Sequence, residues 1–254
     1  MTRGIRSIAS KWRKTKALLR DRNMRQYVPN TRALTSSSLR DMLRTYGMVY
    51  VKPDVGTRGS GVMRVERTKS GRSERYALHS ERTKRTFGHF DAMYRSLLAR
   101  KKKPAYLVQK GIRLLKHYGR PIDIRVMVQR DARKKWVTTG IIARIAAPGK
   151  IVTNYHNGGQ PIALEKIMEP KIGASAAKAF KTRLGMLGKD AAVALSRTYP
   201  SFDSIGADIG VDASLHPWIL EVNTRPDPYI FKHLKNPKAY RRILGYARAL
   251  RRIK

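Results

Sequence analysis

The stretch DIGVDASLHPWILEVN at residues 208–223 carries the most information about the fold. Two runs rich in Ile, Val, Leu and Trp flank a turn that contains His and Pro, and this pattern predicts a β-hairpin. A four-residue loop at 213–216 would set Asp208 directly across from Glu221, with Asn223 on the same face. The other face would supply core side chains, namely Ile209, Val211, Trp218, Leu220 and Val222.

Acidic residues are scarce in the chain but gather around this hairpin. Against 55 basic residues there are only 17 acidic ones. Carboxylate and amide oxygens are the ligands that hard divalent cations prefer, so we predict that Asp208, Glu221 and Asn223 bind magnesium. The alternative is a hairpin whose acids simply face solvent. The clustered acids are Asp203, Asp208, Asp212, Glu221 and Asp227.

The composition indicates a folded protein with an anionic partner. A chain of 254 residues with 41% hydrophobic residues can bury a large core, which argues against global disorder. The formal net charge of +38 attracts anions in a salt-dependent way. Nucleotide phosphates, nucleic acid, an acidic peptide or polymer, and an anionic membrane surface all fit this charge. The alternative is that the charge only serves solubility.

Several classes of protein are excluded by what the sequence lacks. There is no cysteine, so disulfides, thiolate metal sites and cysteine nucleophiles are ruled out. No apolar run reaches the roughly 18 residues of a membrane span, and the first residues lack the apolar segment of a secretory signal. We therefore expect a cytoplasmic protein without a membrane span.

Hydrophobic periodicity predicts alternating helices and strands along the chain. Ser10 is expected to cap a basic helix, and Ser38 a second helix that ends at Gly47. The polar segment 64–86 is expected to form hairpin strands with Gly71 at a turn. Further strands are predicted at 48–51, 62–67, 106–112, 123–130 and 136–145, and further helices at 87–102, 174–199 and 238–254.

A glycine-rich loop follows Lys52 at the end of the strand 48–51. Its glycines would let the backbone approach an anion, and the side chains between them add donors, which suits a triphosphate. An ordinary hairpin turn beside an exposed lysine is the alternative. The spacing differs from GxxxxGK[ST] and from the protein-kinase order of glycines and lysine. The predicted phosphate-binding residues are Lys52, Gly56, Thr57, Arg58, Gly59, Ser60 and Gly61.

The order of these parts resembles the ATP-grasp enzymes over roughly residues 11–228. The segments VYVKPDVGTRGSGV, DIRVMVQR, IVTNYHNGG and WILEVNTRP are most similar to the spore-coat-associated YheC/YheD branch. The resemblance implies an α+β fold in which two lobes with mainly antiparallel sheets clasp the nucleotide. It divides the chain into a basic helical segment at 1–47 with a reduced or absent pre-grasp domain, a small lobe at 48–105 and a large lobe at 106–254.

The same resemblance implies roles for individual residues. Lys11 would be an additional phosphate lysine. Arg125 and Arg144 would face the phosphate and the acyl group of the substrate, with Asn154 beside them, although Asp123 and Arg144 could instead form a cross-strand ion pair. Asp208, Glu221 and Asn223 would hold two magnesium ions. The segment that meets adenine would be Gln109, Lys110, Gly111 and Ile112.

The implied activity is that of an ATP- and magnesium-dependent carboxylate–amine ligase that works through an acylphosphate. The acceptor would be an acidic peptide or polymer, joined to an amine donor, with a role in spore coat formation in the mother cell or the coat. The reduced pre-grasp domain leaves room for a homodimer. Two alternatives stay open, namely an ATP-dependent kinase and a non-catalytic scaffold that binds nucleic acid or coat polymer.

Overall fold

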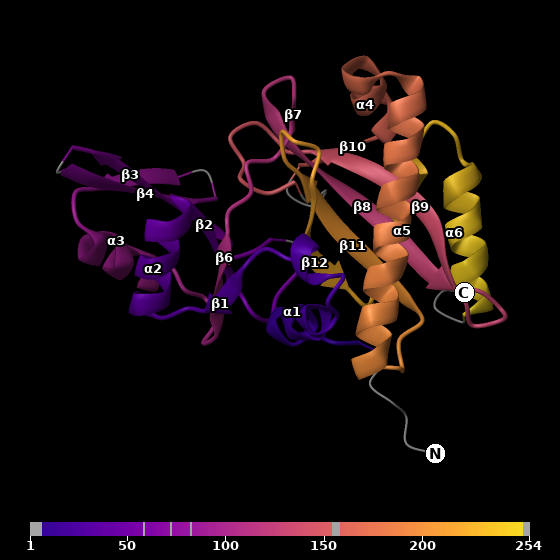
Figure 1. The fold of residues 1–254 in the computed structure, drawn as a ribbon, viewed down its shortest axis with the longest axis horizontal. Helices are drawn as coiled ribbons and strands as arrows, with labels where there is room; N and C mark the ends of the chain where they lie inside the picture. The colour runs from indigo at the N-terminus through magenta and orange to yellow at the C-terminus, as the bar shows by residue number, and fades with distance from the viewer. Residues whose placement is uncertain (1–6, 58, 72, 82, 154–157, 251–254) are drawn as a thin grey trace.

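Two antiparallel sheets, each packed against helices, form the two halves of the molecule (Figure 1). The computed structural model describes residues 7–57, 59–71, 73–81, 83–153 and 158–250. The first sheet has the strand order β1-β6-β2-β3-β4-β5, and the second has the order β10-β9-β8-β11-β12 with β7 beside β8. The predicted α+β fold with two mainly antiparallel lobes is confirmed.

The first half packs two helices against its sheet. Apolar positions of α2 and α3, such as Leu43 and Leu97, meet Val51 and Val65 of the sheet in a buried cluster. The outer strands carry polar residues, as the sequence predicts, and Gly71 lies in their turn with φ +57°. The elements are β1 (Thr31–Ala33), α2 (Ser36–Tyr46), β2 (Met48–Pro53), β3 (Met63–Ser70), β4 (Ser73–Ser80), β5 (Thr83–Phe87), α3 (Phe90–Leu98) and β6 (Tyr106–Lys110).

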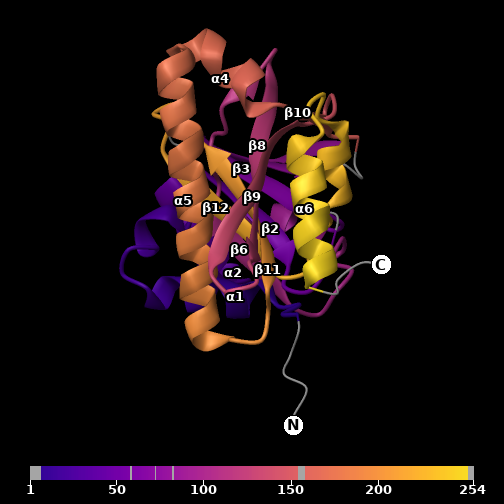
Figure 2. The ribbon, with the colours of Figure 1, turned by 90° about the vertical axis from the view of Figure 1, so that its right-hand side faces the viewer.

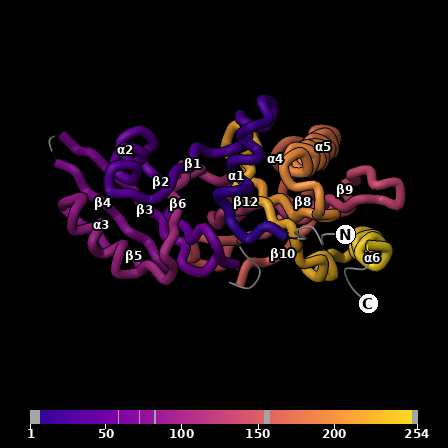
Figure 3. The backbone as a smooth tube through the Cα atoms, turned by 90° about the horizontal axis from the view of Figure 1, so that it is seen from below, coloured from indigo at the N-terminus to yellow at the C-terminus, as the bar shows by residue number. Residues whose placement is uncertain are grey.

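The second half has helices on both faces of its sheet, with α5 and α6 on opposite sides (Figure 3). The α5 side holds the largest apolar cluster of the protein, and on the α6 side Phe231 and Ile243 cover Met127 and Ile142. The elements are β7 (Lys116–His117), β8 (Arg120–Arg130), β9 (Trp136–Ile145), β10 (Gln160–Ile162), α4 (Leu164–Ile172), α5 (Ala174–Thr198), β11 (Ser204–Val211), β12 (Pro217–Asn223), η3 (Tyr229–His233) and α6 (Lys238–Ala249).

The first helix, α1 (Lys11–Arg20), joins the two halves and is followed by the short turn η1 (Arg25–Tyr27). Its predicted cap is confirmed, because the Ser10 side chain accepts a hydrogen bond from the Arg13 amide. The helix packs on α5 and β12 of the second half. At its start the Trp12 amide donates to Asp54 Oδ1 at 2.7 Å, which ties the helix to the end of β2.

Some local predictions are wrong. Thr35 rather than Ser38 caps α2. The Ser38 amide donates to Thr35 Oγ1 and the Thr35 amide donates to Ser38 Oγ, which together form a capping box. The helix nevertheless ends at Gly47 in the left-handed region, as predicted. The helix α3 is shorter than the range 87–102. The helix α4 was not anticipated because Pro170 within it argues against a helix.

The hairpin of β11 and β12 has the predicted pairing, with Asp208 opposite Glu221. A β-bulge follows this pair, so that Ile209 lies opposite Ile219 and Leu220 is the extra residue. The assignment of Trp218 and Leu220 to the core is therefore wrong. Ile219 packs in the core in their place, together with Ile209, Val211 and Val222.

Sheet membership differs from the predicted division of the chain. The strand β6 pairs with β1 and β2, so residues 106–110 belong to the first sheet. From the segment 1–47, β1 is also a strand of this sheet, and α2 packs against it. The helix α1 packs on the second half. The domain limits themselves stay a prediction. Within the described ranges, no helix is both long enough and apolar enough to cross a bilayer.

Candidate nucleotide and magnesium site

A cleft between the two sheets contains most of the predicted site residues. Two adjoining cavities of about 190 and 110 Å³ make up this cleft. The two cavities are adjacent, because they share the lining residues Lys52, Gly59, Val62, Asp208 and Glu221. The first cavity is also lined by Lys11, Gly56, Thr57, Ser60, Arg125, Arg144 and Asn223, and the second by Gln109, Lys110 and Ile112.

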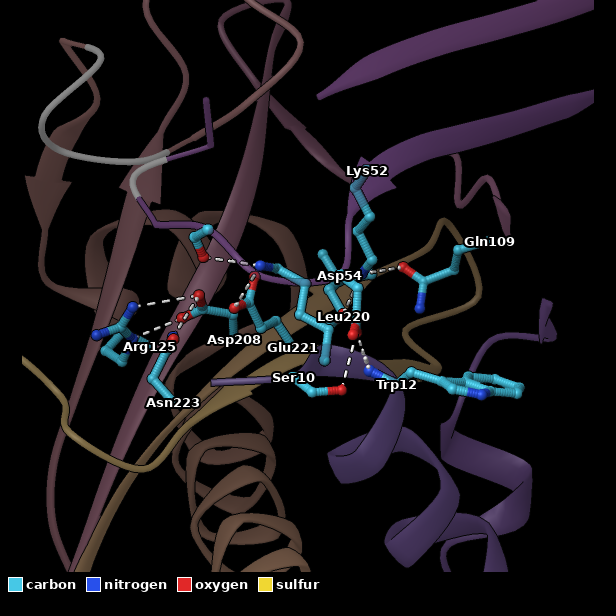
Figure 4. Close-up of polar contacts among 12 residues, drawn as sticks. Ser10, Trp12, Lys52, Asp54, Gln109, Arg125, Asp208, Leu220, Glu221 and Asn223 are labelled. Carbon is cyan, nitrogen blue, oxygen red and sulfur yellow. Dashed lines mark hydrogen bonds and ion pairs between the residues drawn. The ribbon is translucent and has the colours of Figure 1, made fainter. Parts of the chain in front are cut away.

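The hairpin and its neighbour β8 bring carboxylates and guanidinium groups together. Asp208 lies opposite Glu221 on one side and opposite Arg125 on the other. Arg125 donates through Nε to Asp208 Oδ1 at 2.5 Å and through Nη2 to Oδ2 at 3.2 Å. Arg144 Nη2 lies 3.0 Å from Asp208 Oδ1. Asp208 is therefore held by two cations, and Figure 4 shows its contact with Arg125.

Arg144 also forms the cross-strand pair with Asp123 that the sequence allows as an alternative. The two residues lie opposite each other in the β8–β9 ladder, and Arg144 donates to both carboxylate oxygens of Asp123. Only 3% of the Arg144 side chain is exposed. Arg144 thus bridges two buried carboxylates, and the ion pair does not prevent it from lining the cleft.

The charges in the cleft shift the pKa of its buried groups. Burial alone would raise the pKa of Asp208, but the nearby Arg125 and Arg144 guanidinium groups outweigh it and hold that pKa below its usual value. Burial likewise acts to lower the pKa of Arg144, and Asp123 and Asp208 reverse the effect and raise it. Both groups are consequently charged at neutral pH.

Lys52 connects the two sheets from a buried position at the end of β2. Its Nζ donates to Gln109 Oε1 at 2.9 Å and to the Leu220 carbonyl at 3.0 Å, as Figure 4 shows. Thr31 Oγ1 accepts from Gln109 Nε2 at 3.0 Å, which fixes the amide so that its oxygen faces Lys52. Burial lowers the pKa of Lys52 to about 8. A buried, poorly solvated ammonium of this kind favours an anionic ligand.

Helix α1 contributes two further buried lysines. Lys11 Nζ donates to the Gly56 carbonyl at 2.8 Å and lies 3.7 Å from Glu221 Oε1. Lys14 lies one turn further along the same buried face. Its pKa is lowered, chiefly by burial and against the attraction of Glu221. Sequence reasoning missed Lys14, although its spacing from Lys11 and Leu18 on one helix face is the signal that could have found it.

Two glycines of the predicted phosphate loop are required by the backbone. Gly59 and Gly61 have φ of +72° and +74°. A Cβ on Gly61 would lie 2.8 Å from the Tyr106 hydroxyl oxygen. The Gly56 carbonyl, rather than its amide, faces Lys11. Arg58 lies outside the described residues.

The segment predicted to meet adenine borders the smaller cavity. Gln109, Lys110 and Ile112 line it, together with Tyr50, Leu114, Ile151 and Leu220, which give it apolar walls. Gly111 is needed for a different reason, since a Cβ there would lie 2.7–2.8 Å from Met48 atoms. The β-bulge that removes Leu220 from the core is thus what brings its side chain to this cavity.

The donor set suits magnesium. Asp208 and Glu221 lie opposite each other, and Asn223 Nδ2 is 3.5 Å from Asp208 Oδ2. Magnesium is usually bound by one or two carboxylates together with substrate phosphates and water, and this site offers two carboxylates and an amide oxygen. No group of three His, Cys, Asp or Glu residues in the described part of the chain could hold a metal by itself. Asn154 lies outside the described residues.

Comparison with known proteins identifies the family. A model of the YheC/D-like ATP-grasp family matches residues 5–250. The chain belongs to this family. It is 28% identical over 236 residues to the endospore coat-associated protein YheD of Bacillus subtilis, and 19% identical over 222 residues to YheC of the same strain. These alignments cover 88% and 87% of the chain.

The chain spans about half the length of the first of these relatives, with 49% of YheD and 61% of YheC covered. Among solved structures, D-cycloserine synthetase DcsG is similar with a TM-score of 0.57 and 12% identity, over 95% of this chain and 70% of that one. This similarity supports the ATP-grasp fold of the YheC/D-like chain.

Proposed function

We propose that this YheC/D-like ATP-grasp protein is an ATP- and magnesium-dependent carboxylate–amine ligase. The observation that carries the proposal is the convergence in one cleft of two facing carboxylates, Asp208 and Glu221, with buried cations from four different elements. A scaffold that only bound polymer would not need this combination. Those cations are Lys11, Lys52, Arg125 and Arg144.

ATP would occupy both cavities of the cleft. The apolar walls of the smaller cavity suit the adenine ring, and the Lys52 ammonium at the junction suits the phosphates. Lys11 and the loop at 56–61 would hold the terminal phosphates from the other side. The fixed positions of these lysines mean that little reorganisation is needed when charge moves during the reaction.

Asp208, Glu221 and Asn223 would hold the metal. Magnesium supplies neutralisation of the phosphate charge and orientation of the phosphate oxygens. Arg125 and Arg144 now pair with Asp208, and both line the cavity where the phosphates would lie. Guanidinium groups bind phosphate oxygens as well as carboxylates, so these arginines can serve the bound substrates while Asp208 faces the metal.

The reaction needs no nucleophile from the protein. A carboxylate oxygen of the acceptor attacks the terminal phosphorus of ATP, the bond from that phosphorus to the bridging oxygen breaks, and ADP leaves. The amine nitrogen of the second substrate then attacks the acyl carbon, phosphate leaves and the nitrogen loses a proton to solvent. The role of the protein is to position the groups, stabilise charge and exclude water, with the 56–61 loop acting as a lid.

The acceptor is proposed to be an acidic peptide or polymer, recruited by the net charge of +38. The names of YheD and YheC link those relatives to the endospore coat. On this ground we propose a role in spore coat formation, with the protein in the cytoplasm of the mother cell or in the coat. Binding of acidic peptides should weaken from low to high salt, and an affinity independent of salt would rule out this recruitment.

The test is to incubate the protein with ATP, magnesium, acidic peptides and mixed amino acids, and to measure ADP and the mass of the peptide. A ligase gives ADP and a peptide heavier by one condensed amine. Glu221→Ala should abolish both signals, whereas Glu169→Ala, an exposed carboxylate on α4, should retain them. Equal ADP release from wild type and Glu221→Ala would remove the enzyme proposal. A gain of phosphate alone would make the protein a kinase.

A further inference from the structure

The strand β9 has an open edge away from the cleft. It spans Trp136–Ile145, but its outer partner β10 pairs only with residues 143–145. Among the described residues, no other strand pairs with the outer edge from 136 to 142, and no backbone hydrogen bond from a loop reaches it. A strand edge of this kind presents unpaired amide and carbonyl groups to any extended chain that can reach it.

A cavity of about 670 Å³ runs along this edge. It lies between α4 and α5 on one side and η3 and α6 on the other, and Figure 2 shows β9 in the space between α5 and α6. Its apolar lining includes Ile141, Ile162 and Leu234. None of its lining residues belongs to the two cavities of the nucleotide cleft. We call this cavity the β9 groove.

The rim of the β9 groove is strongly basic on both sides. Lys166 and Lys181 come from α4 and α5, and three further cations come from the segment that leads into α6 and from α6 itself. The one carboxylate of the lining, Glu165, forms an ion pair with Lys181. The three further cations are Lys235, Lys238 and Arg242.

We propose that the β9 groove binds an extended acidic peptide segment, which adds as a strand to the edge of β9. Successive side chains of an added strand point to opposite faces of the sheet, and here each face carries lysines. Acidic residues on either face of the peptide would therefore meet a cation. The open edge at 136–142 has the length to pair with about six residues of peptide. The proposal does not depend on the ligase activity.

Binding is tested by fluorescence anisotropy with a labelled peptide of alternating Val and Glu, about six residues long. The wild-type protein should bind it. The same peptide with methyl groups on alternate amide nitrogens keeps the charge but cannot complete the strand, so its affinity should fall at least about tenfold. Equal affinity for the two peptides would show that the surface attracts charge without strand addition, and would overturn the proposal.

The site is tested with Lys238→Glu combined with Arg242→Glu. Both residues are exposed, and Glu at the start of α6 suits the helix dipole, so the fold should tolerate the change. The matched control, Lys84→Glu with Lys103→Glu, changes the net charge equally on exposed residues of the first half. The groove variant should lose at least about tenfold more affinity than the control. Equal losses would assign the binding to the overall charge and overturn the proposal.

A readout on the wild-type protein makes the test independent of how the variants fold. Peptide binding should slow amide hydrogen exchange within residues 136–142 of β9. Unchanged exchange there at saturating peptide would overturn the proposal. A short oligonucleotide that binds more tightly than the peptide, displaces it and loses affinity in the groove variant would also overturn it, because the groove would then serve nucleic acid.

Discussion

The nucleotide cleft and the β9 groove adjoin the same sheet and both contain an excess of cations, but they hold those cations differently. In the cleft Lys11, Lys52, Arg125 and Arg144 are buried, and the two arginines form ion pairs with carboxylates. In the groove Lys166, Lys238 and Arg242 are exposed. Buried, fixed charge is suited to a reaction with one defined geometry. Exposed lysines on flexible stems are suited to an anionic partner whose detailed shape varies.

The two sites also differ in what the sheet itself contributes. At the cleft β8, β11 and β12 form a continuous ladder, which fixes the positions of Asp208 and Glu221. At the groove the ladder stops, because β10 is only three residues long. The cleft would therefore bind its ligands through side chains, whereas the groove would bind a peptide mainly through the unpaired backbone of β9.

Replacing Arg144 with Met should strongly destabilise the protein. The change removes the cation that bridges Asp123 and Asp208, both of which are buried. Loss of one partner from a buried ion pair typically costs about 3–5 kcal/mol, because the remaining carboxylates keep their desolvation penalty. The free energy of unfolding is measured by urea titration.

The matched control is Arg197→Met, which breaks a pair with Asp21 in which the arginine side chain is 68% exposed. Exposed pairs contribute at most about 1 kcal/mol, so this variant should unfold close to wild type. Equal losses of stability in the two variants would show that burial does not strengthen the contribution of the Arg144 ion pairs to stability.

Replacing Glu221 with Gln should separate the two sites functionally. If the ligase proposal holds, magnesium-dependent ADP release should fall by roughly 10²–10³-fold, the usual scale for loss of one preorganised electrostatic group. Binding of the acidic peptide to the β9 groove should not change. The converse variant, with Lys238→Glu and Arg242→Glu, should retain release of ADP with a small-molecule acceptor. Any variant that impairs both functions equally would show that the sites are not independent.

The cleft could be predicted further from sequence than the groove, for physical reasons. The sequence predicts the hairpin and the pairing of Asp208 with Glu221, but with a loop at 213–216, whereas Val211 pairs with Pro217 and the loop is 212–216. The loop is one residue longer than predicted, and the bulge at Leu220 restores the predicted pair. The bulge at Leu220 has no local signal. The contact of Arg125 with Asp208 joins residues 83 positions apart, and it depends on which strands become neighbours. Periodicity reveals the strands but not their order.

The groove could not be predicted because it has no motif. Its lining residues lie between Thr138 and Arg242 in the sequence and include residues of α4, a helix that is hard to predict because it contains Pro170. The open edge exists only because β10 ends after three residues. The glycine-rich loop is a local feature that the sequence shows directly, and Gly59 and Gly61 lie in the left-handed region that glycine readily adopts. Local backbone conformation can be predicted from the sequence more readily than packing between distant segments.

The affinity for ATP should depend on pH through Lys52. Its pKa of about 8 in the free protein means that the ammonium form dominates below pH 8. A bound triphosphate favours that charged form and raises the pKa, so binding takes up a proton above pH 8. Affinity should be level between pH 7 and 8, and should then fall by up to about tenfold per pH unit as Lys52 loses its proton. Isothermal calorimetry across pH 7–9.5 measures this.

Lys52→Arg is the matched control, because a guanidinium stays charged throughout this range. Its affinity should vary less with pH than that of wild type. In the free protein, the contribution of Lys52 to stability should change with pH in the opposite direction to the ATP affinity. An unfolded lysine binds more protons than Lys52 does between about pH 8 and the unfolded value of 10.5, so the contribution of Lys52 to stability rises with pH over that window. An ATP affinity that is level to pH 9.5 would contradict the placement of Lys52 on the phosphates.

The smallest expected effect concerns the single carboxylate of the β9 groove. Glu165 pairs with Lys181 and is about one-third exposed, so the pair is partly screened by solvent. Glu165→Gln keeps the shape of the side chain, removes the negative charge and frees Lys181 for the peptide. The affinity for the Val–Glu peptide should rise by a factor of about two to five, as expected for one partly screened charge.

The matched change Glu169→Gln, on the same helix but outside the lining of the groove, should have a smaller effect. Under the two proposals, removal of an acid from the cleft should lower activity, whereas removal of Glu165 should improve binding, because Glu165 competes with the acidic ligand for Lys181. A loss of peptide affinity in Glu165→Gln would show that the Glu165–Lys181 pair maintains the shape of the groove and that Glu165 does not compete with the peptide.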